Sequence, residues 1–220
     1  MKPATQHLWA RFVADHPELR PCEGVLLAAH GAMMRCFRAG GKLLACGNGG
    51  SAADADHIVG ELMKGFLLRR PAPAGFAAKL RDTWGGAEAD AQAAALAAGL
   101  QGALPAISLT AHAALTSAFA NDVAADMAFA QQVYGYGMPG DVLLAISTSG
   151  HSANVCKAVR VARAKDMISI GLTGEGGGAL AALCDICIAV PERETYRVQQ
   201  LHLPVYHLLC ALAESECFDV

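Results

Sequence analysis

The sequence carries little charge of either sign. Charged residues make up only 17% of the 220 residues, and 17 Lys and Arg against 20 Asp and Glu leave a formal net charge of −3. No stretch is rich in Lys or Arg, whereas a groove that binds nucleic acid needs a stripe of basic side chains. We therefore expect no nucleic acid among the partners of this protein.

Long apolar runs are also lacking. The first twenty residues scatter Arg11, Asp15 and Glu18 among apolar residues, which is unlike the continuous apolar segment of an export signal. The longest uncharged stretch, residues 91–120, is interrupted by Gln, Gly, Pro and His, so it does not resemble a membrane-spanning helix of roughly 18 or more apolar residues. These features predict a cytoplasmic protein with no membrane partner.

The eight cysteines show no framework of paired spacings. In a protein of a reducing compartment they are expected as free thiols, and most lie among Ala, Leu, Val and Ile, where Cys behaves as a small hydrophobe. Cys184 and Cys187 form a single C-x-x-C, but a zinc ribbon needs a second such pair. No structural zinc site is expected from the cysteines.

The composition suits one α/β domain spanning residues 1–220. Hydrophobic residues reach 54%, enough for a large core in a chain of this length. Short runs that are apolar on both faces, each followed by helix-like sequence, predict parallel strands covered on both sides by helices. The expected fold is a three-layer α/β/α sandwich with a five-stranded parallel sheet. Its predicted strands are Lys42–Cys46, Ala106–Leu109, Asp141–Ser147, Ile168–Thr173 and Ile186–Val190.

Helical segments are expected at both ends of the chain. The N-terminal extension, residues 1–40, contains two amphipathic patterns, and Tyr196–Glu216 reads as one long C-terminal helix in which Pro204 should produce a kink or remove one backbone hydrogen bond. Residues 69–103 form an insertion that turns Ala-rich and favours helix. An insertion of this length is typically a lid, an interface element or a disordered segment.

The strongest motif is the hydroxyl-rich loop Ser147-Thr148-Ser149-Gly150-His151-Ser152, which follows the third predicted strand and precedes a helix. Ligands in open α/β sheets bind beyond the carboxyl ends of the strands, and hydroxyls with backbone N–H groups at a helix N-terminus hold phosphate without Lys or Arg. The alternative is an ordinary Ser-rich turn that caps a helix.

A second loop, Gly47-Asn48-Gly49-Gly50-Ser51, follows the first predicted strand. Its glycines allow a ligand to approach the backbone, and its polar side chains can bond sugar hydroxyls or cap the helix. It is neither the dinucleotide fingerprint nor a P-loop. Although it could be a plain strand-to-helix turn, two polar loops at the ends of two strands indicate one crevice for a small phosphorylated ligand.

Two further groups carry chemistry. His57 and Glu61 lie four residues apart on one face of a predicted helix, where they can share a metal ion or form an ordinary surface pair. Gln199 and His207 on the C-terminal helix could border one cleft, whereas His202 is expected to be a core histidine.

In their order along the chain, these motifs resemble the sugar isomerase (SIS) domain family as used in phosphoheptose isomerases. Outside residues 69–103, the resemblance covers nearly the whole chain. It is carried by the two loops, His57 with Glu61, Asn121-Asp122, the run Ser147 to Val155, Leu172-Thr173-Gly174, and Arg197-Val198-Gln199 with His207.

The resemblance implies an enzyme that interconverts sedoheptulose 7-phosphate and D-glycero-D-manno-heptose 7-phosphate through an enediol. It implies Glu61 as the general base and His207 as the acid, and a homotetramer with active sites between subunits. The metal ligands it implies, for zinc, are His57, Glu61, Gln199 and His207. The substrate-binding residues it implies are Asn48, Gly49, Gly50, Ser51, Asn121, Asp122, Ser147, Thr148, Ser149, Ser152 and Gln199.

Two positions depart from the family pattern. Gln200 stands where the family usually has an acidic residue, and Gly65 stands where a basic residue is common, so that Lys64, Arg69 or Arg70 would have to replace it. Two alternatives therefore stay open: a regulatory or scaffold SIS protein of the type that associates with the replication initiator DnaA, and an isomerase of another phosphosugar. Fold alone does not separate them.

Overall fold

The computed structural model describes residues 1–73 and 75–218, and it contains the predicted five-stranded parallel sheet. The strands run side by side in the order β2-β1-β3-β4-β5, and neighbouring strands pair in parallel, as with Leu43 opposite Val142. Their bounds are β1 Leu43–Cys46, β2 Ala106–Ser108, β3 Val142–Ile146, β4 Ile168–Thr173 and β5 Ile186–Ala189.

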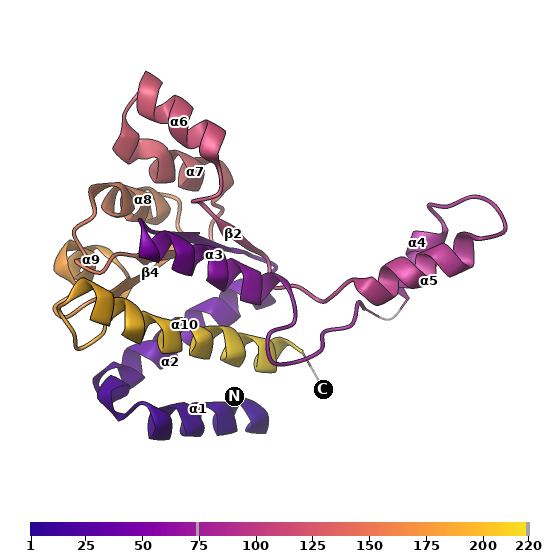
Figure 1. Ribbon diagram of the computed structural model, residues 1–220, viewed down its shortest axis with the longest axis horizontal. Helices are drawn as coiled ribbons and strands as arrows, with labels where there is room; N and C mark the ends of the chain where they lie inside the picture. Colours follow the sequence, from indigo (N-terminus) through magenta and orange to yellow (C-terminus); the bar gives the residue numbers. More distant parts are fainter. Residues whose placement is uncertain (74, 219–220) are drawn as a thin grey trace.

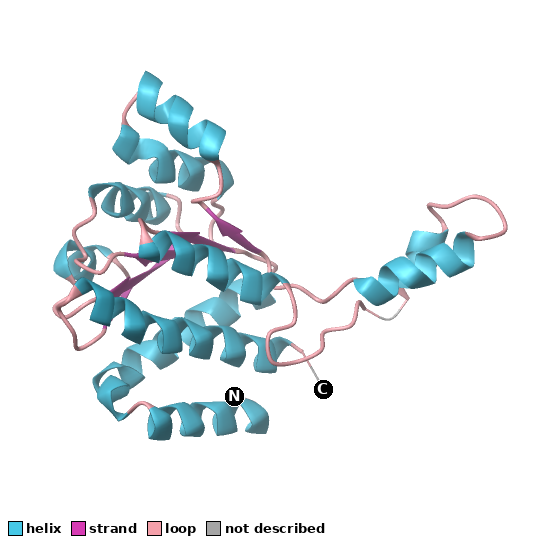
Figure 2. Ribbon diagram, in the orientation of Figure 1, coloured by secondary structure: helices cyan, strands magenta, loops and turns pink. Residues whose placement is uncertain are grey.

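Helices cover both faces of the sheet, as Figures 1 and 2 show. Every residue of β1 and β3 is buried, because each strand faces a helical layer on both sides. One core includes Leu43, Leu144 and Leu172, and the other includes Leu44, Leu143 and Ala145, so alternate strand residues enter opposite layers. The chain is thus an α/β/α sandwich.

The first helical layer contains helices from both ends of the chain. It contains α2 Glu23–Arg38, α3 Gly50–Met63 and α10 Thr195–Cys217, with α1 Pro3–Asp15 packed on the outside of α10 and joined to α2 by the 3-10 helix η1 Pro17–Cys22 (Figure 1). Helix α10 runs through Pro204 as one element. Because proline has no N–H, it removes a backbone hydrogen bond there without ending the helix.

The second layer covers the opposite face. It contains α8 Ala153–Ala164 and α9 Gly178–Leu183, with α7 Ala128–Tyr136 packed on α8. Helix α6 Ala113–Asp122 and the 3-10 helix η2 Ala125–Met127 complete this end of the molecule (Figure 1). No helix within residues 1–73 and 75–218 is long and apolar enough to cross a membrane.

The strand order indicates where a ligand crevice is expected. The chain moves from β1 outward to β2 and then returns to β3 on the other side of β1. In open α/β sheets, ligands bind at the carboxyl ends of the strands at such a reversal. The glycine loop follows β1 and the hydroxyl-rich loop follows β3, so both predicted loops flank this point.

The predicted insertion forms an arm that extends away from the sandwich (Figure 1). It contains α4 Phe76–Arg81 and α5 Ala89–Gly99, which pack on each other. Pro71 and Gln101 pair in an antiparallel bridge at the base of the arm, and we call this base the neck. Helix α5 lies within the Ala-rich stretch, whose composition favours helix.

Candidate active site

A cavity of about 300 Å³ lies at the carboxyl ends of β1 and β3. Eight of the residues predicted to bind substrate line it. The lining residues are Asn48, Gly49, Gly50, Ser51, Ile146, Ser147, Thr148, Ser152, Thr195 and Gln199. Sequence reasoning missed Thr195, although a hydroxyl at the first residue of α10, one turn before Gln199, was an available signal.

The surroundings of the cavity suit an anion. None of the described residues that line it is charged, but three helices begin beside it: α3 at Gly50, α8 after Ser152, and α10 at Thr195. None of these three N-termini is capped by the side chain of its N-cap residue. At the start of α3, the N–H groups of Ser51 and Ala52 already donate to backbone carbonyls of the preceding loop. Helix N-termini carry partial positive charge, which favours a phosphate in this position.

The hydroxyl-rich loop is shaped by contact with a second glycine loop. Ser147 Oγ lies 2.9 Å from Ser152 Oγ, so both hydroxyls face the same space. Gly150 has φ +67°, and a Cβ there would overlap the carbonyl of Gly177. Only glycine fits this position, because it adopts the left-handed region and lets two backbones meet.

Another close contact fixes Gln199 over the start of α3. A Cβ on Gly50 would lie 2.8 Å from Gln199 Cδ and closer still to its amide nitrogen. On the other side of the cavity, Asn48 and Asn154 exchange two side-chain hydrogen bonds of 3.0 and 2.8 Å. These contacts hold both amides before any ligand arrives.

Three of the residues predicted to bind substrate lie elsewhere in this protomer. The Ser149 hydroxyl accepts a 3.2 Å hydrogen bond from the His151 backbone and does not line the cavity. Asn121 and Asp122 lie exposed at the end of α6, where the Asn121 amide donates to the Asp122 carboxylate at 2.8 Å.

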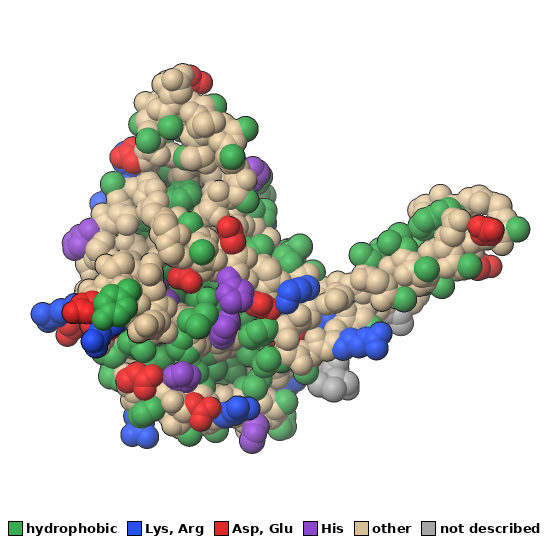
Figure 3. All heavy atoms as spheres, viewed as in Figure 1, with side chains coloured by type: hydrophobic (Ala, Val, Ile, Leu, Met, Phe, Trp, Pro, Cys, Tyr) green, Lys and Arg blue, Asp and Glu red, His purple; other side chains and the backbone are tan. Residues whose placement is uncertain are grey.

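A second polar group gathers where α3 passes α10. His57 Nε2 lies 3.2 Å from Glu61 Oε1, and His57 Nδ1 lies 3.0 Å from the Tyr206 hydroxyl. The His57 and His207 rings meet edge to face with centroids 5.0 Å apart. Figure 3 shows histidine and acidic side chains together in this region of the surface. Sequence reasoning missed Tyr206, which orients His57.

Burial perturbs the groups around this cluster. It lowers the pKa of His207, and the adjacent His57 lowers it further, while Glu61 opposes the shift. His207 Nε2 is buried and makes no hydrogen bond. Burial raises the pKa of Asp54 on α3, with Tyr206 and His57 opposing, and burial together with Asp54 raises the pKa of Tyr206. At neutral pH His207 is therefore a neutral imidazole with a free ring nitrogen.

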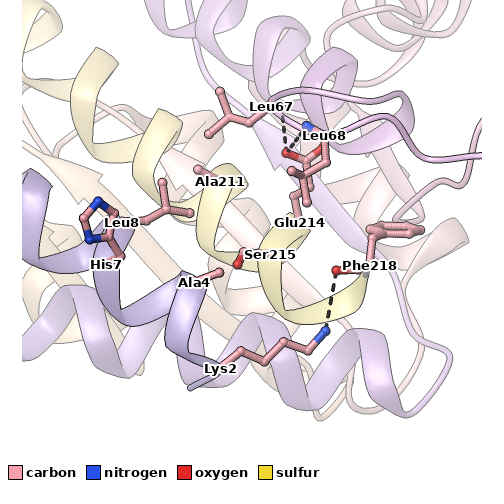
Figure 4. Close-up of a pocket in the computed structure, with 10 residues that line it drawn as sticks. All are labelled: Lys2, Ala4, His7, Leu8, Leu67, Leu68, Ala211, Glu214, Ser215 and Phe218. Atoms are coloured by element: carbon pink, nitrogen blue, oxygen red, sulfur yellow. Dashed lines mark hydrogen bonds between the residues drawn. The ribbon is translucent and has the colours of Figure 1, made fainter. Parts of the chain in front are cut away.

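A buried ion pair fixes the end of α3 against α10. Arg70 is fully buried and donates to Glu214 at 2.7 Å and to the carbonyls of Glu61 and Leu62. Glu214 also accepts N–H groups from the loop after α3, including that of Leu68, as Figure 4 shows. Arg70 is thus fully engaged in structure and does not replace the basic residue absent at Gly65.

The other two basic residues suggested for that role are more exposed. Lys64 Nζ lies 3.0 Å from Glu61 Oε2, and the Lys64 side chain is 58% exposed. Arg69 is exposed at the start of the neck. Lys64 is therefore the one of the three whose charge reaches the predicted base.

The predicted zinc ligands are divided between two places. His57, Glu61 and His207 lie together, and two imidazoles with a carboxylate make a plausible donor set for zinc. Gln199, however, contacts Gly50, about 11 Å from His57 along α3 at 1.5 Å per residue. No group of three or more His, Cys, Asp or Glu side chains in the described chain is already arranged around a metal position.

Comparison with known proteins identifies the family. One SIS domain model matches residues 88–212 and a second matches residues 22–87. The phosphoheptose isomerase of Rhodospirillum rubrum is 42% identical over 197 residues, which are 90% of this chain and 88% of that protein. That of Aneurinibacillus thermoaerophilus is 36% identical over 94% of this chain and 87% of its own length.

Comparison with solved structures points to the same family. A phosphoheptose isomerase from Neisseria gonorrhoeae is 32% identical, covers 96% of this chain and 98% of its own, and superposes with a TM-score of 0.70. One from Francisella tularensis is also 32% identical over 91% of this chain and 90% of its own, with a TM-score of 0.73. The chain therefore belongs to the SIS-domain family and, within it, to the phosphoheptose isomerases.

Proposed function

We propose that this protein isomerises sedoheptulose 7-phosphate to D-glycero-D-manno-heptose 7-phosphate by proton transfer through an enediol. The observation that carries the proposal is an uncharged cavity at three uncapped helix N-termini, on the same pair of helices as a carboxylate and a neutral imidazole. The first arrangement suits a phosphate and the second suits proton transfer.

The phosphate would occupy the cavity. The hydroxyls of Ser51, Ser147, Thr148 and Ser152 would donate to its oxygens, together with N–H groups at the start of α8. Ser51 and Ser147 are buried, so their side chains are held in place before binding. A fixed phosphate limits the positions of the reacting carbons, and such positioning lowers the activation barrier by several kcal/mol.

Glu61 would remove the proton from the carbon beside the carbonyl group and return it to the neighbouring carbon. His57 lies against the Glu61 carboxylate and Lys64 lies on its other oxygen, so the carboxylate has a defined direction. His207 would donate a proton to the carbonyl oxygen and take one from the adjacent hydroxyl. A neutral imidazole performs this role in enediol chemistry, and the lowered pKa of His207 supplies that form.

His57, Glu61 and His207 would hold a divalent ion, most suitably zinc. Bound zinc polarises carbonyl and hydroxyl oxygens as a Lewis acid. The buried, unbonded Nε2 of His207 supports this assignment, because a buried nitrogen without a partner is costly unless something binds it. A Gln199 amide oxygen would complete the set only if it came from another copy of the chain.

The site would be shared between copies in a homotetramer. In one protomer the predicted site residues other than Ser149 fall into three separate groups: the cavity, the cluster around Glu61, and Asn121 with Asp122 on α6. An assembly that sets the cavity of one copy against the other groups of a second copy uses all of them. Eight free cysteines are compatible with the reducing cytoplasm proposed as its location.

The test is turnover of sedoheptulose 7-phosphate by the wild-type protein and by Glu61→Gln, with substrate binding measured in parallel. Loss of a general base should lower turnover about 100-fold or more while binding is kept. Near-normal turnover by Glu61→Gln would remove Glu61 from this role. A wild-type protein that binds phosphosugars but converts none would instead support the regulatory alternative, although the relatives speak for the enzyme. Conversion of a different phosphosugar would identify an isomerase of that sugar.

Mixing two inactive variants tests the shared site. Glu61→Gln and a Ser147→Ala, Ser152→Ala double variant would each be dissociated and then reassembled together. If each site combines the cavity of one copy with Glu61 of another, mixed oligomers contain some intact sites and regain turnover. A mixture that stays inactive while it reassembles would mean that each protomer holds its own complete site.

A further inference from the structure

The α4–α5 arm has no support from its own protomer. It is a hairpin of a six-residue and an eleven-residue helix, and isolated helices below about 12–15 residues are marginal in water. Of the described residues 76–99, only Ala93 is buried. The arm extends into solvent away from the sandwich (Figure 1), so a stable hairpin needs another surface to cover it.

The arm also presents apolar side chains outward. Leu96 on α5 is 44% exposed, Leu100 directly after α5 is 40% exposed, and Phe76 on α4 is exposed as well. Figure 3 shows apolar side chains along the arm. Because the other apolar side chains of α5 are alanines, Leu96 is the main apolar group that projects from this helix.

The neck holds the arm in a fixed direction. Gly65 N donates to Gln101 Oε1 at 2.6 Å, and Gly102 N donates to the Arg70 carbonyl at 2.7 Å. Arg70 is in turn held by Glu214 of α10. The arm therefore starts from a rigid base at the Glu61 end of α3, which makes it a defined projection from that edge.

The same chain has an apolar groove beside this base, shown in Figure 4. It has a volume of about 420 Å³ and lies between α1, α10 and the loop after α3. Its apolar lining includes Leu8, Leu67, Leu68, Ala211 and Phe218, and Leu67 is 55% exposed. The chain thus carries an uncovered apolar projection and an uncovered apolar groove.

We infer that the arm of one copy packs its Leu96 and Leu100 face into the groove of a second copy, and that the second copy returns the same contact. A two-fold pair requires this reciprocity, since a contact of residue i with residue j is repeated as j with i. A second copy is the occupant because the groove and arm are complementary parts of one chain, and both adjoin the Glu61 end of α3. The choice of a second copy of the chain as the partner of the arm rests on the proposed shared site, whereas the uncovered arm and groove do not depend on it.

The experiment is a pair of charge variants with a charge-reversal rescue. Leu96→Lys on the arm and Leu67→Lys in the groove should each weaken association at least 10-fold in sedimentation velocity over a range of concentrations. The double variant Leu96→Lys, Leu67→Glu should recover association, because the two new charges would face each other. Met138→Lys changes a side chain of similar exposure, 59%, that touches neither the arm nor the groove, and it should associate as the wild type does.

Hydrogen exchange gives a second readout that does not depend on activity. Arm amides in residues 76–99 should be protected in concentrated wild-type protein and lose protection on dilution. Excision of residues 72–100, with Asn-Gly joining Pro71 to Gln101, should abolish the association, and the antiparallel bridge between those residues allows a two-residue turn. Wild-type association of Leu96→Lys, or arm amides that exchange at unfolded rates in the associated protein, would overturn the inference even if the enzyme is active.

Discussion

The contact between Gly50 and Gln199 allows a sharp test of how the cavity works. Gly50→Ala places a methyl group 2.8 Å from Gln199 Cδ and nearer still to its amide nitrogen. Ordinary contacts of carbon are about 3.5 Å or longer, so the amide must move by roughly 1 Å. The obstacle is the end of a flexible side chain, so the fold should tolerate the change while Gln199 leaves its position.

The expected effect is on catalysis. A misplacement of about 1 Å in an active site can reduce the rate about 100-fold, which corresponds to about 2.7 kcal/mol. Steady-state assays with sedoheptulose 7-phosphate should therefore show kcat/KM lower by about that factor. Thermal unfolding should show a midpoint near that of the wild type.

Gly60→Ala is the matched control on the same helix. Nothing lies within 4 Å of a Cβ at Gly60, and alanine in a helix interior is about 0.5–1 kcal/mol more favourable than glycine. Its unfolding midpoint should rise by roughly 1–4 °C with kinetics unchanged. The reasoning fails if Gly50→Ala keeps full kcat/KM, or if its loss of activity only follows a loss of stability.

Three further predictions concern the phosphate, the buried histidine and the metal. Ser152→Ala removes one of two paired hydroxyls, and loss of a hydrogen bond to a charged group of about 1.5–3 kcal/mol should raise KM about 10-fold or more in steady-state kinetics, with a smaller change in kcat. Burial lowers the pKa of His202 from 6.5 to about 4, so the unfolded chain binds the extra proton and stability should fall by up to about 3 kcal/mol as pH drops from 6.5 to 4. Urea unfolding of His202→Leu should lack this slope. Chelation should lower turnover, and zinc should restore it and raise the unfolding midpoint.

The sheet was predictable because its signals are local. Strand β4 has the predicted bounds Ile168–Thr173, and the other four strands are each within two residues of their predicted bounds at either end. The differences lie at strand ends, where pairing decides the boundary. Leu109, for example, still donates its N–H to Ala45 after β2 has ended. Apolar runs specify where strands lie, while neighbouring strands specify where they stop.

The arm and Arg70 were less predictable. An Ala-rich stretch favours helix, but it carries no apolar stripe to show which surface the helix covers, so its extension away from the sandwich could not be read from the pattern. Arg70 was one of three candidates for a charge near the substrate, and nothing local indicated that Glu214, 144 residues later, would bury it. The spacing of residues along the sequence gives no sign of long-range pairing of this kind.

Within one protomer, the distance between the cavity and the cluster around Glu61 depends on one pair of helices. Gly50 meets Gln199, His57 meets Tyr206, and Arg70 ties the end of α3 to Glu214, so α3 and α10 lie parallel in nearly constant register. The distance between the anion cavity and Glu61 is therefore set by helical rise, and a shift of one turn would change it by about 5.4 Å. Packed helices resist such shifts far better than loops do. In the proposed shared site, α3 and α10 therefore fix the spacing between the cavity of each copy and the carboxylate and imidazole that the same copy offers to its neighbour.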